Sequence, residues 1–232
     1  MTTADRAHVV DLASTRLRQL NQALHQLRPD TNETLWRIAN PRGRHSVAVG
    51  IDAPIAIEID GHVGYYCAGM NKHATVVVNG NAGVGVAENI MSGTVHVKGD
   101  ASQSAGATGC GGRLIIDGNA SARCGISMKG VDILVKGGVG HMSAFMAQAG
   151  TLVVLGDAGE SLGDSIYEAR LYVRGKVASL GADCIEKPMT DHHKAKLARK
   201  LAAGGMTGVD LGRFRRYGSA RRLYHFHVDN GY

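Results

Sequence analysis

The side chains best suited to catalysis or metal binding are spread along this chain and form no compact motif. The sequence has 11 histidines and 4 cysteines. His225 and His227 would share one face of a strand, and His192 and His193 lie at a helix start. Neither pair forms an HExxH motif or joins the cysteines in a four-ligand set. We therefore predict no metal site in this chain.

Two glycine-rich stretches point to other chemistry. The segment from Gly80 to Gly85 reads GNAGVG, whereas a dinucleotide fingerprint needs GxGxxG between a strand and a helix. Cys110 lies in a second such stretch, GATGCGG, which begins at Gly106. Both fall inside an internal repeat that explains their glycines without a ligand. We expect no cofactor site and no catalytic cysteine.

The repeat is marked by seven glycines spaced 19 residues apart, each preceded by apolar-x-apolar-x: Gly61, Gly80, Gly99, Gly118, Gly137, Gly156 and Gly175. The two apolar columns hold only Ile, Val or Leu, and they comprise residues 57, 76, 95, 114, 133, 152 and 171 and residues 59, 78, 97, 116, 135, 154 and 173. Residues two apart on a strand face the same side, so these columns mark one inward face. Glycine, alanine or serine recurs three residues after each glycine, and glycine or alanine seven after, where the chain must turn and stack closely.

A unit of 19 residues is too short for a β-α-β crossover, which needs about 30 residues. It is long enough for one coil of a parallel β-helix, whose connections are right-handed in nearly all cases. The sequence therefore predicts an all-β fold, a right-handed parallel β-helix (solenoid) of about seven 19-residue coils with N- and C-terminal helices. Stability would come from stacking, and both ends need caps.

The predicted domains are an N-terminal helical arm (1–35), the β-helix (36–185) and a C-terminal helix with an extended basic tail (186–232). Apolar residues spaced three and four apart predict a helix over 5–27, whose seam packs either on its own solenoid or on a partner. Alternation over 45–51 and 55–59 predicts the first, capping strand. A second helix runs from Thr190-Asp191 to about Ala203 and stops at Gly204-Gly205. We expect residues 214–232 to lie extended.

One outward column lies between the two core columns and is apolar from residue 115 onward. Stacked coils would make it a continuous ridge, which a soluble monomer rarely leaves bare. Either the N-terminal helix or a partner subunit is expected to cover it. Together with the basic tail this predicts an interface made of Ile115, Leu134, Val153, Tyr172, Arg215, Arg216 and Tyr217.

The other outward positions carry scattered charges, Glu58, Asp60, His96, Lys98, Asp117, Lys136 and Arg174, with no convergent acid pair. We predict no catalytic residue. A self-contained enzyme that uses this outer sheet stays as an alternative, with His96 and Lys98 as the residues to substitute.

The net charge of +6 belongs to the tail, since ten Lys/Arg face four Asp/Glu from residue 185 onward, while the rest of the chain holds sixteen of each. A basic tail suits nucleic acid, an acidic protein surface or a solvated arm. Of these we predict a protein partner and no nucleic acid. We expect no signal peptide and no membrane span, and we interpret the four widely spaced cysteines as reduced thiols of a cytoplasmic protein.

Several coils resemble a known family. The segments 62–70 (HVGYYCAGM), 80–89 (GNAGVGVAEN), 124–132 (CGISMKGVD) and 140–148 (GHMSAFMAQ) look like the C-terminal GXGXG β-helix domain of glutamate synthase, which also occurs in the C subunit of formylmethanofuran dehydrogenase. The tail from Phe214 to Asn230 looks more specifically like the free-standing form, the B subunit of N-methylglutamate synthase. The resemblance covers residues 36–230 and is weaker for the N-terminal helix.

The resemblance implies a non-catalytic bridging subunit of a hetero-oligomer. A glutaminase-type amidotransferase subunit would release ammonia, and a subunit with FMN and an iron–sulfur cluster would carry the synthase barrel. N-methylglutamate synthase makes N-methylglutamate and ammonia from methylamine and glutamate. Another glutamate-synthase-like oxidoreductase, or a formylmethanofuran dehydrogenase complex, is the alternative assembly. The choice between methylamine and ammonia lies in other subunits.

Overall fold

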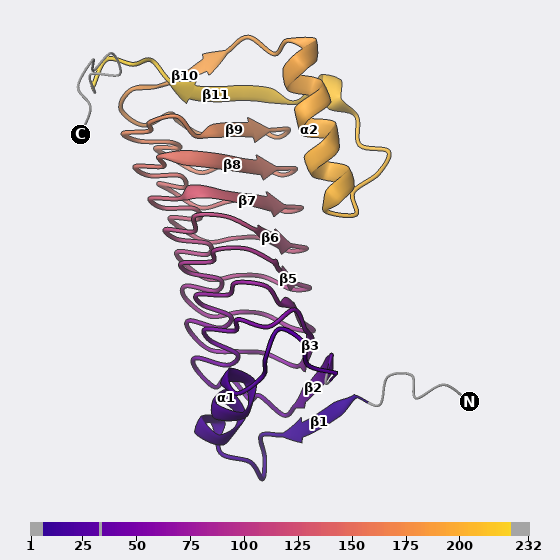
Figure 1. Cartoon of the computed structure of the whole chain (residues 1–232). Helices are drawn as coiled ribbons and strands as arrows, with labels where there is room; N and C mark the ends of the chain where they lie inside the picture. Colours follow the sequence, from indigo (N-terminus) through magenta and orange to yellow (C-terminus); the bar gives the residue numbers. More distant parts are fainter. Residues whose placement is uncertain (1–6, 33, 224–232) are drawn as a thin grey trace, which may run out of the picture.

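A computed structural model describes residues 7–32 and 34–223. These residues form one sheet of eleven strands in the order β1-β2-β3-β4-β5-β6-β7-β8-β9-β11-β10. Figure 1 shows the coils stacked along a rod, with β1 and α1 at one end and β10, β11 and α2 at the other. The strands are β1 (His8–Asp11), β2 (Leu35–Ala39), β3 (Ala56–Asp60), β4 (Thr75–Val78), β5 (Thr94–Val97), β6 (Arg113–Ile116), β7 (Lys129–Val135), β8 (Ala149–Val154), β9 (Arg170–Val173), β10 (Cys184–Lys187) and β11 (Arg215–Ser219).

The parallel β-helix with its 19-residue coil is confirmed. From β3 to β9 each strand pairs in parallel with the next, and Ile57 aligns with Val76, which aligns with Val95, and so on to Leu171. All fourteen side chains of the two apolar columns are 0% exposed. Trp36 and Ile38 of β2 extend the same ladder below β3. Each coil therefore buries its aliphatic pair against the pairs of its neighbours.

A second wall of the rod is only one residue wide in each coil. Isolated parallel bridges join Val63, Ala82, Ala101, Ala120, Val139, Ala158 and Val177, again 19 apart. At one end of this wall the chain passes the glycines that mark the repeat. A Cβ on Gly156 would lie 2.6 Å from the backbone carbon of Gly137 in the coil below. This close approach explains why glycine recurs there.

The third wall is a stack of turns that we call the turn edge, and six of these turns are residues 65–70, 84–89, 103–108, 122–127, 141–146 and 160–165. Every second residue of each turn has a left-handed backbone, as at Gly85 (φ +69°), Ala87 (φ +55°) and Asn89 (φ +58°). The amides alternate in direction: Ala87 N–H donates to Cys67 O of the preceding coil, whereas Gly85 and Asn89 donate to the following coil. A left-handed backbone disfavours most side chains, yet only four of the eighteen left-handed positions in these six turns are glycine, namely Gly85, Gly106, Gly125 and Gly163.

Polar side chains form a further ladder beside the marker glycines. Asn81 Oδ1 accepts from the Asp100 amide at 2.9 Å, Asp100 Oδ1 accepts from the Asn119 amide at 2.7 Å, and Asn119 Oδ1 accepts from the Gly138 amide at 2.9 Å. These bonds satisfy backbone donors at a corner where the strand ladder has ended.

The N-terminal arm differs from the predicted helix over 5–27. Residues His8–Asp11 form β1, which pairs in parallel with β2, and α1 spans only Leu17–His25. Asp11 ends the strand because its carboxylate accepts from the Ala13 amide at 2.8 Å. The apolar seam packs on its own solenoid, with Leu20 and Leu24 buried in the core, so the alternative of a partner-docking helix is wrong for this seam.

The capping strand predicted over 45–51 is also wrong. Ser46, Ala48 and Gly50 have positive φ, and the Ser46 and Gly50 amides donate to the turn of the next coil. The segment is therefore one more turn of the turn edge. Its backbone also repeats every two residues, which explains why its apolar alternation resembled a strand. The residues predicted at 55–59 do form a strand, β3, and the described chain is capped by β1, β2 and α1.

The C-terminal helix is confirmed. Helix α2 spans Asp191–Ala203, Gly204 caps it, and Gly205 follows with φ +73°. A short 3-10 turn, η1 (Leu211–Arg213), leads into β11, which inserts antiparallel between β9 and β10. The extended tail is thus confirmed over Arg215–Ser219, while residues 224–232, with His225 and His227, lie outside the described residues. Neither described helix is long and apolar enough to cross a membrane.

The turn edge generates a stability prediction. Met146 has φ +51° and is 36% exposed, whereas Met91 is 42% exposed without a positive φ. Met146→Ile should lower the free energy of unfolding by about 1 kcal/mol because a β-branched side chain fits a left-handed backbone poorly. Met91→Ile should change it by less than about 0.5 kcal/mol. Urea unfolding of both variants tests this, and equal effects at the two positions would contradict it.

Candidate docking surface

The apolar ridge predicted as an interface is buried within the chain itself. Ile115, Leu134, Val153 and Tyr172 are between 0% and 5% exposed, and they form one cluster with Leu197, Leu201, Met206 and Phe214. Figure 1 shows α2 beside the upper strands of the rod. The cover is therefore α2 and the segment after it. Neither the N-terminal helix nor a partner subunit covers this ridge.

The ridge is apolar because its four side chains pack against α2 and the segment after it. Leu197 and Leu201 are spaced four residues apart, so they lie on one face of the helix. Burial of a large aliphatic or aromatic side chain stabilises a fold by roughly 1.5–3 kcal/mol. Four ridge residues and two leucines thus anchor the C-terminal arm to the rod.

The three tail residues of the predicted interface differ in how deeply they are buried. Tyr217 is 3% exposed and belongs to the core of the solenoid. Arg216 is half-buried, its Nε donates to Pro188 O at 3.0 Å, and burial together with the charge of Arg170 lowers its pKa. Arg215 is exposed on β11. Only the arginines therefore remain available to a partner.

The residues of the alternative enzyme hypothesis do come together. On the outer face of the sheet, Asp117 Oδ1 lies 2.9 Å from His96 Nε2 and 2.8 Å from Lys136 Nζ, and Asp117 Oδ2 lies 3.8 Å from Lys98 Nζ. Burial raises the Asp117 pKa, but the hydrogen bonds from Lys136 and His96 outweigh it, so the pKa is lowered overall. An ionised carboxylate held by cations has no proton to donate and stabilises the sheet surface.

Metal ligands and reactive thiols do not gather in the described part of the chain. It contains no group of three or more His, Cys, Asp or Glu that could hold a metal ion. All four cysteines are free, as the sequence predicted, and three of them are buried. Burial raises the thiol pKa of Cys67 and Cys124 to about 12, so these thiols are packing residues.

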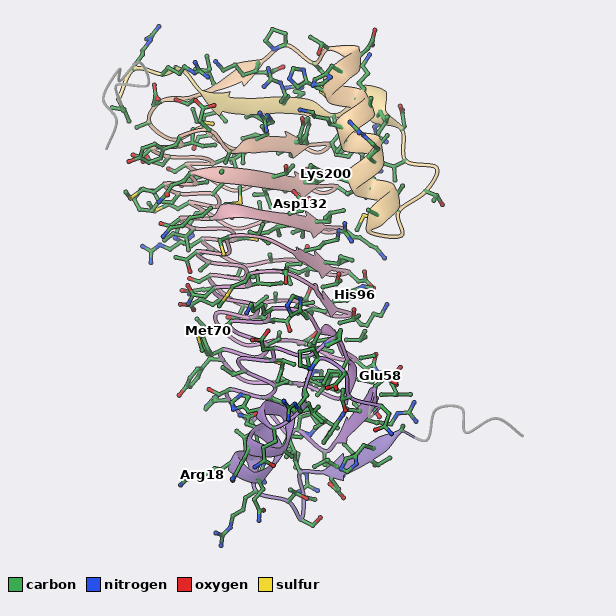
Figure 2. All side chains as sticks on the ribbon, in the orientation of Figure 1. Arg18, Glu58, Met70, His96, Asp132 and Lys200 are labelled. Carbon is green, nitrogen blue, oxygen red and sulfur yellow. The ribbon has the colours of Figure 1, made fainter. Side chains whose placement is uncertain are left out.

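Four of the nine exposed large apolar side chains of the described residues lie on the turn edge, namely Tyr65, Met70, Val84 and Met146. Tyr65 is 52% exposed, Val84 47% and Met70 39%. Tyr65 and Val84 occupy the same position in successive coils, and the Tyr65 ring stacks on His45 with 4.0 Å between centroids. Figure 2 shows Met70 on the edge of the rod opposite to His96 and Lys200. The turn edge is therefore the candidate docking surface, and the recurrence of Tyr65 and Val84 at a 19-residue spacing was the sequence signal for it.

The burial of the ridge predicts the behaviour of α2 variants. Leu201→Asp should lower the free energy of unfolding by about 3 kcal/mol or more, because it places an unpaired charge against the ridge. Ala202→Asp puts the same charge on the exposed side of the same helical turn and should change it by less than about 0.5 kcal/mol. Urea unfolding and trypsin cleavage at the lysines of α2 measure both, and intact, protected α2 in Leu201→Asp would refute the contact.

The Asp117 cluster predicts a pH effect. Because the folded-state pKa lies below the ordinary value of 3.8, the carboxylate contributes its full stability above pH 3.8, and the contribution disappears as the pH falls through the folded pKa. Asp117→Asn should lower the free energy of unfolding at pH 7 by about 1–3 kcal/mol and less at low pH. Denaturant unfolding at both pH values checks this, with the exposed Asp30→Asn as the control. A loss independent of pH would contradict the assignment.

Comparison with known proteins gives one strong similarity. The chain is 61% identical over 222 residues to protein GlxC of Rhizobium meliloti (strain 1021), covering 96% of this chain and 97% of that protein. No protein-family model matches the sequence, and no solved structure matches it. Because the match covers 222 of the 232 residues, the shared region includes most of the 19-residue repeat and most of both terminal arms. The chain belongs to the family of protein GlxC.

Proposed function

We propose that this chain is a structural subunit of a glutamate-synthase-like complex and contributes no catalytic residue. It holds a glutaminase-type amidotransferase subunit against a synthase subunit that carries FMN and an iron–sulfur cluster. The specific complex we propose is N-methylglutamate synthase, which converts methylamine and glutamate into N-methylglutamate and ammonia. We place it in the cytoplasm, where free cysteines stay reduced.

The turn edge is the observation that carries this proposal. Its backbone is left-handed at positions i, i+2 and i+4 of every turn, as at residues 85, 87 and 89. A GXGXG pattern places its glycines at this spacing, because glycine adopts a left-handed backbone at no steric cost. In this chain four of the six turns carry one glycine at these positions, Gly85, Gly106, Gly125 and Gly163, and this shared spacing supports the resemblance between these coils and the β-helix domain of glutamate synthase.

The packing of the rod supports a role in assembly over a role in chemistry. The interior is filled by the aliphatic columns, which are 0% exposed, so reactants have no access to it. The ionic cluster on the outer sheet holds an acid whose pKa is lowered, which suits a structural ion pair. A stacked rod of this kind presents long fixed faces to its neighbours, as solenoid proteins commonly do.

We expect the partner subunits to contact the turn edge and the arginines of β11. Tyr65 and Val84 offer apolar area, and aromatic and apolar anchors commonly dominate the energy of interfaces. Arg215 offers a charge that an acidic partner surface would pair with.

The test is co-expression of this chain with an amidotransferase subunit and an FMN and iron–sulfur subunit of the proposed complex. Gel filtration should give one assembly that contains all three chains, with flavin absorbance carried by the synthase subunit. The assembled complex should convert methylamine and glutamate, and omission of this chain should abolish stable association of the other two. Catalysis by the isolated chain, or full assembly without it, would overturn the proposal.

Surface variants sharpen the test. The double variant Tyr65→Asp and Val84→Asp should reduce recovery of the assembly by about tenfold or more, because each change puts a charge into an apolar contact. Ala202→Asp, on the exposed side of α2, is the matched control and should assemble normally. Circular dichroism of each free chain verifies that the rod is folded, and normal assembly of the double variant would exclude the turn edge as the docking surface.

A further inference from the structure

A cavity of about 470 Å³ opens between the beginnings of β6 to β9 and one face of α2. The sheet contributes one outward column of the repeat, in which Arg113, Asp132, Thr151 and Arg170 are spaced 19 residues apart. The helix contributes Lys196, Arg199 and Lys200, which lie on one side of α2 at a spacing of three and four residues. Figure 2 shows Asp132 and Lys200 close together where the helix meets the sheet.

The lining of this cavity is strongly cationic. Five of its side chains are Lys or Arg, and Asp132 is the one acidic residue among the lining residues. Lys200 and Asp132 form an ion pair, with 2.6 Å between Nζ and Oδ1. Among the described residues, no acidic group lies within ion-pair distance of Arg113, Arg170, Lys196 or Arg199. Four cations therefore face one cavity without a counter-charge.

Two buried donors in the lining lack acceptors. Tyr172 is 1% exposed, and its Oη has no hydrogen-bond partner among the described residues. Arg113 Nε is likewise shielded from solvent and unpartnered. Burial raises the Tyr172 pKa against the opposing charges of Arg216 and Arg170, so the phenol remains a donor. Buried polar groups are nearly always paired, which means that these two donors point to an acceptor that the chain itself does not supply.

We propose that this cavity binds a small oxyanion with at least two negative charges, borne by carboxylate or phosphate groups. Guanidinium groups match the oxygens of both classes in bidentate geometry, and ammonium groups add charge without directional demand. The volume falls in the range of small-molecule sites. The anion bridges the outward column of the sheet and α2, and it relieves repulsion among cations that the fold has brought together. This site stands independently of the proposed complex, since every group in it comes from this chain.

The experiment is isothermal titration calorimetry of the full chain at fixed ionic strength with three probes. Sodium pyrophosphate tests the phosphate source, succinate tests the dicarboxylate source, and acetate tests a single carboxylate. We expect saturable binding of pyrophosphate, succinate or both, and at least about tenfold weaker binding of acetate. Binding of one probe alone identifies the class of anion, and binding of both supports recognition of the shared charge.

Variants assign the binding to the cavity. Arg170→Gln should lower the affinity for the probe by about tenfold. Tyr172→Phe should lower this affinity severalfold while keeping the ring that packs under α2. Arg123→Gln is the matched control, because Arg123 lies in the same coil as Arg113 but on the turn edge. Circular dichroism and thermal unfolding verify that each variant is folded.

If none of the three probes binds saturably, the proposal is overturned. The cluster would then be a contact for acidic side chains of a partner. Equal weakening by Arg123→Gln and Arg170→Gln would also overturn the proposal, because binding would then reflect the net charge of the chain alone.

Discussion

The stacking of one aliphatic side chain on the equivalent residue of the next coil is the interaction on which the rest of this structure depends. Ile133, for example, lies between Leu114 and Leu152 with none of its surface exposed. No single coil can bury such a residue, so each coil is stable only between two others. The constant length of 19 residues keeps these contacts in register, and an added residue would turn the core column of a strand outward.

The corners of the rod follow from the same requirement. Coils that stack in register bring equivalent backbone segments together, so glycine recurs where they approach most closely, as at Gly137 and Gly156. At the turn edge every second residue has a left-handed backbone, and the amides of these residues donate alternately to the coils on either side. This arrangement completes the hydrogen bonding between coils without a third strand, and it leaves side chains such as Tyr65 and Met70 on the surface.

The terminal arms cap the two ends of the rod, and the C-terminal arm brings cations together on one side of it. Strand β11 runs antiparallel to β9 and ends the parallel ladder, while α2 covers the apolar ridge with Leu197 and Leu201. The same helix turns Lys196 and Lys200 toward the outward column of the sheet. The packing that hides the ridge therefore also gathers the cations of the tail around one cavity.

The sequence alone determined the architecture and the extent of α2. Fourteen aliphatic residues in two columns allow one buried face only, and the Gly204-Gly205 pair ends a helix wherever that helix lies. Prediction from the local residue pattern was wrong where a strand and a turn both repeat every two residues. Residues 45–51 alternate in polarity as a strand does, but their left-handed positions make them a turn. Prediction from local pattern failed again at His8–Asp11, where pairing with β2 overrides the helical spacing.

Only the tertiary structure decided what covers the ridge and where the tail charges gather. A sequence shows that Ile115, Leu134, Val153 and Tyr172 need a cover, because burial of apolar area is favourable wherever the partner comes from. It does not show which of several amphipathic segments supplies that cover, since Leu17-to-Leu24 and Leu197-to-Leu201 offer similar faces. That choice depends on which end of the rod each segment leaves. Helix α2 follows directly from the last strands and reaches the ridge, whereas α1 leaves the opposite end and packs against the turn at Ser46.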